Sequence, residues 1–200
     1  MCIRDSGYHE ILFKNGASLK ARAVVLATGA ESGRLELPAA ARVPVRPVKG
    51  QILRLRSSAS APLPATRVIR TPEVYAVPRG DGRLVVGATM EERGFDTSVT
   101  AGGVLELLRR AYEALPGIAE LELVEARAGL RPAATDNGPV IGPSPVPGLV
   151  WATGHWRHGI LLAPITGQAV AAALAGEEPP ARTLPFSPAR FARAAAEVAG

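Results

Sequence analysis

The sequence predicts a mixed α/β (α+β) fold in which an α/β unit is interrupted by an inserted antiparallel sheet. A continuous apolar run at residues 23–27 is typical of a strand that is covered on both faces. Apolar side chains recur at roughly every second position of residues 51–56, as expected for a half-buried antiparallel strand. A short strand at residues 149–152 and a helix at residues 165–174 then predict a return to the α/β unit.

The chain begins with a predicted hairpin. Residues 9–13 and 18–21 are expected to form two strands, because Asn15-Gly16 supplies the positive φ angles of a tight turn. The apolar strand at residues 23–27 follows. Residues 37–47 contain three prolines and are expected to be a connector that leaves one structural unit for another.

The middle of the chain predicts an antiparallel sheet and one helix. Residues 74–78 and 84–88 alternate like strands around a glycine-rich turn. Apolar residues at helical spacing predict an amphipathic helix from Thr100, its expected N-cap, to Leu115. A strand at residues 121–129 is expected to rejoin the sheet.

The C-terminal third is rich in glycine and proline as far as Gly148. The predicted helix at residues 165–174 ends at Gly176, and Ser187-Pro188 is a favourable start for a last helix. The apolar side of that last helix would carry Phe191, Ala195 and Val198.

Composition narrows the class of protein. The chain has 200 residues, of which 47% are hydrophobic, so it can bury a core. Its net charge of +5 invites a nucleic-acid partner, but the basic residues are dispersed and lack interleaved aromatic residues. Neither a membrane span nor a signal peptide is predicted, so we expect a cytoplasmic protein without a membrane or nucleic-acid partner.

Cysteine and histidine usage argues against a metal site. The single cysteine, Cys2, excludes a disulfide within the chain, and the three histidines lack zinc-ligand spacing. Because no G-x-G-x-x-G occurs, either the α/β fold is incomplete or the cofactor is not a dinucleotide.

Several motifs, in this order and spacing, resemble the glycine oxidase branch of the D-amino-acid oxidase superfamily from about Tyr8 to Leu174. The motifs are ATGA (27–30), PVKGQ (47–51), GATME (87–91), GLRPAATDNGPVIG (129–142) and TGHWRHGILLAPITG (153–167). The last two are the specific ones, since a turn like the first occurs across many flavoproteins.

The resemblance implies a discontinuous FAD-binding domain of the Rossmann-like type. Its parts would be residues 1–43 and 135–200, and residues 44–134 would form an antiparallel-sheet substrate-binding domain. The family also has an N-terminal glycine-rich turn that grips the FAD pyrophosphate, and the sequence has no counterpart. We therefore expect residues 1–6 to be non-native and the native polypeptide to be longer, with the missing N-terminal half as a partner.

The activity that the resemblance implies is the FAD-dependent oxidative deamination of glycine or a small primary or secondary amine acid. Oxygen would reoxidise the flavin, and the products would be an oxo acid, ammonia or an amine, and hydrogen peroxide, with a role in thiamine biosynthesis. A sarcosine oxidase, a D-amino-acid dehydrogenase and an inactive fragment remain alternatives. Homo-oligomer formation also stays open.

Four residues match the family's substrate site. Arg131 matches the carboxylate-binding arginine, because a guanidinium makes two charge-assisted hydrogen bonds to a carboxylate; the alternative is a surface ion pair. Arg157 matches a second arginine or is a stacked structural residue. Tyr75 and Met90 match cavity-lining residues, with cross-strand packing and core packing as alternatives, and Glu73 replaces a family histidine beside the tyrosine.

The resemblance places the flavin ring along the run that precedes a helix expected to begin near Pro164. Backbone N–H groups and the positive helix end there would stabilise the anionic reduced ring. The two histidines of the run are expected to be packing residues, since no general base is required when the substrate amine is neutral. The expected cofactor-binding residues are Thr28, Gly29, His155, Trp156, Arg157, His158, Gly159, Ile160 and Leu161.

Overall fold

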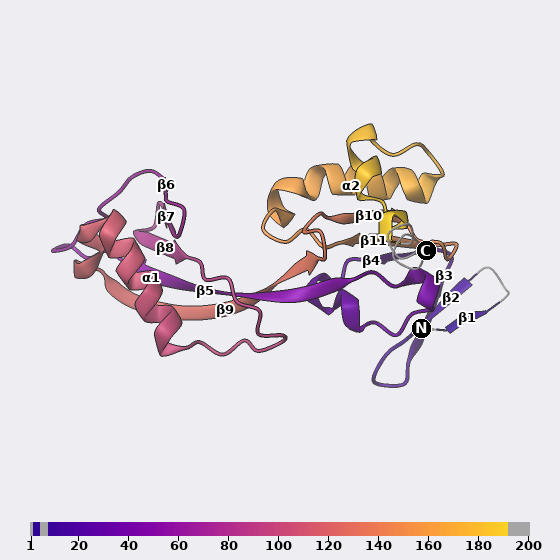
Figure 1. Cartoon of the computed structure of the whole chain (residues 1–200), viewed down its shortest axis with the longest axis horizontal. Helices are drawn as coiled ribbons and strands as arrows, with labels where there is room; N and C mark the ends of the chain where they lie inside the picture. Colours follow the sequence, from indigo (N-terminus) through magenta and orange to yellow (C-terminus); the bar gives the residue numbers. More distant parts are fainter. Residues whose placement is uncertain (1, 5–7, 192–200) are drawn as a thin grey trace, which may run out of the picture. The chain divides into compact units, whose positions relative to one another are not determined.

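The computed structural model describes residues 2–4 and 8–191 and contains two compact units (Figure 1). The first unit consists of Met1–Pro47 and Arg131–Gly200, and the second of Val48–Leu130. No helix in the described part of the chain is long and apolar enough to cross a membrane. The mixed α/β prediction is confirmed, because each unit pairs a sheet with a helix.

The first unit contains two small sheets. One has the order β1-β2-β3 and contains the predicted hairpin, with Gly16 at a φ of 83° in its turn. The other has the order β10-β11-β4, in which β4 and β11 run parallel with Leu26 paired to Trp151. The strands are β1 (Cys2–Arg4), β2 (Tyr8–Leu12), β3 (Ser18–Ala21), β4 (Val24–Leu26), β10 (Val140–Pro143) and β11 (Leu149–Thr153).

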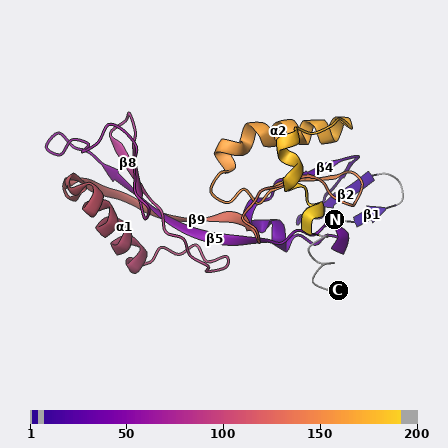
Figure 2. The same ribbon diagram turned by 45° about the horizontal axis from the view of Figure 1, so that its top comes forward.

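Helix α2 (Gly159–Ala175) lies along one face of the β10-β11-β4 sheet (Figure 2). The helix ends as predicted, because Gly176 adopts the left-handed conformation of a C-cap. The expectation that β4 is covered on both faces is wrong for the described residues, since Val25 is 39% exposed at the edge of its sheet. Short 3-10 helices complete the unit: η1 (Gly29–Arg34), η2 (Ala39–Ala41) and η4 (Ala181–Phe186).

One correction concerns the connector, and one prediction for this unit lies partly outside the described residues. The predicted connector at residues 37–47 ends early, because η2 occupies part of it and strand β5 begins at Val45. The predicted last helix is described only as far as Phe191, where the backbone has begun to turn helically. The other two apolar positions of that prediction, Ala195 and Val198, lie outside the described residues.

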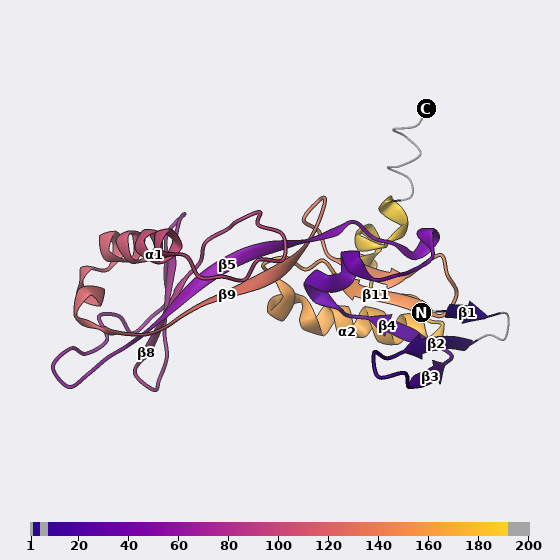
Figure 3. The same ribbon diagram turned by 90° about the horizontal axis from the view of Figure 1, so that it is seen from below.

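The second unit is built on a five-stranded sheet of order β6-β7-β8-β5-β9. Helix α1 lies on one face of this sheet (Figure 3). Its N-cap is the predicted Thr100, whose side chain accepts a hydrogen bond from Gly103 N. The elements are β5 (Val45–Arg56), β6 (Ile69–Arg70), β7 (Tyr75–Pro78), β8 (Arg83–Gly87), α1 (Ala101–Ala114), η3 (Pro116–Glu120) and β9 (Glu122–Ala134).

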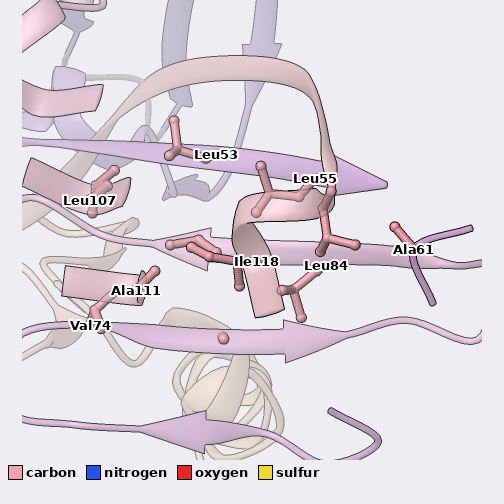
Figure 4. Close-up of a cluster of buried hydrophobic side chains, with 11 residues drawn as sticks. Leu53, Leu55, Ala61, Val74, Leu84, Leu107, Ala111 and Ile118 are labelled. Carbon is pink, nitrogen blue, oxygen red and sulfur yellow. The ribbon is translucent and has the colours of Figure 1, made fainter. Parts of the chain in front are cut away.

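The core of the second unit fills the space between this sheet and α1 (Figure 4). Alternate residues of each strand point toward the helix, as the period of two predicts. The buried side chains of this core are Leu53, Leu55, Ala61, Val74, Ala76, Leu84, Val86, Leu107, Ala111, Ile118 and Leu121. The intervening residues, among them Ile52, Tyr75 and Gly87, therefore face the opposite side of the sheet.

Strand β9 is longer than predicted. The sequence suggested an end at Gly129, but the strand continues through Pro132 to Ala134. Proline is tolerated because β9 is the edge strand of the sheet, where a missing N–H breaks no central ladder. The extension puts Arg131 and Pro132 on regular strand backbone.

Candidate active site

In the first unit, β4 and β11 end at the same edge of their sheet, where α/β folds bind ligands. Thr28-Gly29 follows β4, and Gly154 follows β11. Gly29 and Gly154 have φ angles of 56° and 72°, in the left-handed region that favours glycine. A β-carbon on Gly29 would meet no atom within 4 Å, so the backbone of this turn is open to a flat ligand.

A cluster of hydroxyl groups joins these two turns. Ser32 Oγ lies 3.0 Å from Thr28 Oγ1 and 2.7 Å from Thr153 Oγ1, and it donates to Gly29 O over 2.7 Å. Ser32 and Thr153 are almost fully buried, so these bonds satisfy groups that water cannot reach. Sequence reasoning missed both residues, although Thr153 opens the TGHWRHG motif.

The end of β9 meets the loop that follows β11 within the same unit. Trp156 N donates to Pro132 O over 2.7 Å, and Ala133 forms an antiparallel bridge with His155. Arg131 precedes this contact by one residue and is partly buried. The structure therefore brings together the predicted carboxylate-binding arginine and the predicted flavin loop.

His155 is turned toward helix α2. Its Nε2 lies 2.9 Å from Thr166 Oγ1, and burial lowers the pKa of the imidazole below its ordinary value. The ring is therefore neutral at pH 7 and is held by a structural hydrogen bond. His158, by contrast, is exposed immediately before the helix.

Trp156 and Arg157 form a stacked pair. The Trp156 backbone, in the turn between β11 and α2, has a φ of 47°, which is uncommon for a bulky residue. The Arg157 guanidinium carbon lies 5.7 Å from the centre of the Trp156 ring, within the range of a cation–π contact. Arg157 itself is exposed.

Helix α2 starts earlier than predicted. Residues Gly159, Ile160 and Leu161, expected in a loop, form its first turn, and Pro164 lies inside the helix. The first N–H groups of a helix have no partner within it, so this turn offers donors to an anion. Ile160 and Leu161 are 95% and 77% exposed, so an apolar surface lies beside those donors. Both features fit the isoalloxazine ring of FAD, which is flat, apolar and negatively charged when reduced.

Tyr75 and Met90 belong to the second unit. Tyr75 pairs with Gly87 across β7 and β8, and Met90 lies three residues after Gly87 with 62% exposure. Lys49 pairs with Glu91, so Met90 stands opposite Gly50 and points to the same face of the sheet as Tyr75. The sheet thus presents both predicted cavity residues on the face opposite α1.

The sequence matches the family described as DAO, FAD dependent oxidoreductase, over residues 4–173. The chain belongs to this family, and FAD is the cofactor of its enzyme class. It is 39% identical over 186 residues to a glycine oxidase of Geobacillus kaustophilus, covering 92% of this chain and 49% of the relative. It is also 44% identical over 158 residues to a bifunctional protein ThiO/ThiG of a Nostoc species, covering 78% of this chain and 24% of the relative.

Solved structures agree with these relatives. The crystal structure of the Geobacillus kaustophilus glycine oxidase superposes with a TM-score of 0.83 at 38% identity, covering 92% of this chain and 49% of that one. The iminodiacetate oxidase of a Chelativorans species gives a TM-score of 0.83 at 32% identity, with coverages of 92% and 50%. The predicted resemblance is confirmed, and the chain spans about half the length of the glycine oxidase that it matches.

Proposed function

We propose that the complete polypeptide containing this chain is an FAD-dependent oxidase of glycine or a similarly small amine acid. With glycine, one molecule each of oxygen and water would be consumed, and glyoxylate, ammonia and hydrogen peroxide would form. The observation that carries the proposal is the contact between Trp156 N and Pro132 O. This contact holds Arg131 next to residues 155–161, which comprise the turn after β11 and the start of α2, within one compact unit.

Arg131 would fix the substrate carboxylate through two charge-assisted hydrogen bonds. Arg157 would be a second cation for the same carboxylate, held by its stacking on Trp156. The Tyr75 hydroxyl would add a neutral hydrogen bond, and Met90 would limit the size of the group on the α-carbon. Fixing the carboxylate in this way orients the α-carbon, which is the main requirement for hydride removal.

Residues of the first unit would hold FAD. The Thr28-Gly29 turn and the start of α2 would contact the cofactor, with the N–H groups of Gly159 and Ile160 directed at the anionic edge of the ring. When bound, FAD would supply the acceptor for the substrate hydride. His155, neutral and bonded to Thr166, would orient the loop and would not abstract a proton.

We further propose that the first unit is part of the FAD-binding domain and the second unit is the substrate-binding domain. The FAD pyrophosphate would be bound by an N-terminal portion of the complete polypeptide, since this sequence contains no G-x-G-x-x-G. The oxidised product would serve thiamine biosynthesis, as the resemblance to the glycine oxidase branch implies. The name of the Nostoc relative supports the same assignment.

The test is to load the complete polypeptide with FAD and measure peroxide, ammonia and oxo acid from glycine. We expect stoichiometric formation of all three. Dye reduction without peroxide would instead assign a dehydrogenase. Iminodiacetate and sarcosine belong in the same assay, because the similarity to iminodiacetate oxidase favours a secondary amine as the second candidate substrate. If no amine in this set reduces the flavin, the proposal fails.

A further inference from the structure

Two polar side chains of β5, Lys49 and Gln51, are fully buried in the second unit. Both stand on the α1 side of the sheet, because they alternate with Ile52 on the opposite side. A buried ammonium group requires a charged partner. Lys49 Nζ lies 2.9 Å from Asp96 Oδ2 and 3.8 Å from Glu91 Oε2.

The Gln51 amide connects Glu91 to the start of α1. Its Nε2 donates to Glu91 Oε1 over 2.8 Å and to Thr100 Oγ1 over 3.1 Å, and its Oε1 accepts from Thr100 N over 3.0 Å. The amide also packs tightly against the helix, since a β-carbon on Gly103 would stand 2.3 Å from Nε2. Burial alone would raise the pKa of Glu91, but hydrogen bonds from Thr89 and Gln51 and the charge of Lys49 outweigh it and lower that pKa.

These side chains lie next to a bulge between β5 and the segment after β8. Ile52 pairs with Gly87, whereas Lys49 pairs with Glu91, so three steps on one strand match four on the other. The extra residue lies at Ala88, where the ladder of β8 has ended. With an uninterrupted ladder, Met90 would stand opposite Lys49 and point toward α1, because a slip of one residue turns every side chain to the other face.

The hydrogen bonds select the bulged register. They hold the residues on both sides of Met90: Gln51 N donates to Thr89 Oγ1 over 2.8 Å, and Thr89 Oγ1 donates to Glu91 Oε1 over 2.6 Å. In the uninterrupted register, the thioether of Met90 would face the buried ammonium of Lys49 and could not pair with it. The polar cluster therefore stabilises the register that leaves Met90 on the Tyr75 side.

We propose that Lys49 and Gln51 are positioning residues that fix this bulge and thereby hold Met90 where it sets the size of the accepted substrate. The inference rests on the proposed function, in which Met90 lines the substrate cavity. It goes beyond that function by assigning a role to two residues on the α1 side of the sheet, which would act on the substrate only through the position of Met90.

Neighbouring glycines in the first turn of α1 provide a matched test. Gly103→Ala would displace the Gln51 amide, whereas a β-carbon on Gly102 meets no atom within 4 Å. The measured quantity is the ratio of kcat/KM for glycine to kcat/KM for D-alanine, in the complete FAD-loaded polypeptide. We expect a change of about fivefold for Gly103→Ala, and no change for Gly102→Ala.

Asp96→Asn tests the Lys49 side of the cluster and keeps the test decisive if Gly103→Ala does not fold. Asp96 is exposed, so this substitution removes the negative charge that lies 2.9 Å from Lys49 Nζ without opening the core. The same ratio should change, and neither substitution should change it further in a Met90→Ala background. That non-additivity would not follow from a general loss of stability.

The outcomes separate this inference from the proposed function. If Met90→Ala alters the ratio but Gly103→Ala and Asp96→Asn do not, the positioning role of Lys49 and Gln51 is refuted. The assignment of Met90 to the substrate cavity is then still supported. Additive effects in the Met90→Ala background would also refute the positioning role. If Met90→Ala leaves the ratio unchanged, the assignment of Met90 to the substrate cavity is itself wrong.

Discussion

The phenol of Tyr75 lies directly against Gly87 on the neighbouring strand. A β-carbon on Gly87 would stand 2.5 Å from the phenolic oxygen, which is closer than real contacts allow. Glycine at this position therefore lets the aromatic side chain cross the sheet toward β5, where Ile52 lies beside the same site. The position of the Tyr75 hydroxyl depends on this missing side chain.

Gly87→Ala is expected to weaken glycine binding by displacing the Tyr75 ring. If the hydroxyl contacts the carboxylate, the KM for glycine should rise by about tenfold, the value of one lost hydrogen bond. Tyr75→Phe should have a similar effect. Gly80→Ala is the control, since a β-carbon there meets nothing within 4 Å. Steady-state kinetics with unchanged KM in both Gly87→Ala and Tyr75→Phe would remove Tyr75 from the substrate site.

Arg131→Ala is expected to cost about 2 kcal/mol or more of transition-state stabilisation, because the substrate carboxylate loses the guanidinium that is its charged hydrogen-bond donor. The measurement is kcat/KM for glycine in the complete polypeptide. Arg127→Ala is the control, because Arg127 is an exposed arginine of the same strand. Equal kinetics for the two variants would contradict the role of Arg131.

The burial of His155 predicts a pH dependence of stability. Its pKa is lowered from the ordinary value of 6.5, so the unfolded chain binds more protons than the folded one at mildly acidic pH. The contribution of His155 to the free energy of unfolding is therefore fully present above about pH 6.5. It declines as the pH falls through the folded pKa.

Urea unfolding of wild type and His155→Gln at several pH values would measure this effect. The free energy of unfolding of the wild type, relative to that of His155→Gln, should fall as the pH is lowered from about 7.5 to about 5. A difference that stays constant over this range would show that the imidazole titrates normally.

The core beneath α1 predicts a large difference between two leucines of the same helix. Leu107 is 3% exposed and packs in the cluster of Figure 4, whereas Leu105 is 68% exposed. Leu107→Ala should lower the free energy of unfolding by about 2–5 kcal/mol, because it leaves a cavity. Leu105→Ala should change it by less than about 0.5 kcal/mol. Denaturant titration would contradict this picture of the core if the two variants were equally stable.

Local signals in the sequence predicted much of the fold. Thr100 caps α1, Gly176 ends α2 and Gly16 closes the first hairpin, each through backbone chemistry that the residue type determines. Two of the boundary errors lie near prolines. The strand predicted to end at Gly129 continues through Pro132, because an edge strand tolerates proline, and the helix expected to begin near Pro164 starts at Gly159.

The candidate site was less predictable, because its contacts join distant segments. The bonds of Ser32 to Thr153 and of Trp156 to Pro132 depend on tertiary pairing that no local pattern encodes. The side to which Met90 points was also unpredictable from the sequence. Continuing the alternation of β8 without the bulge would turn Met90 toward α1, whereas the observed pairing turns it to the opposite face. Motif spacing located the residues, but only the pairing of strands gave their neighbours.

The extra residue at position 88 has a consequence for aligning this chain with others. Deleting Ala88 would leave Gly87 opposite Ile52 and Glu91 opposite Lys49, so the flanking partners would not change. A homologue one residue shorter here could keep its counterpart of Met90 in the same place. The gap in such an alignment belongs between Gly87 and Thr89, and a gap placed after Met90 would equate residues from opposite sides of the sheet.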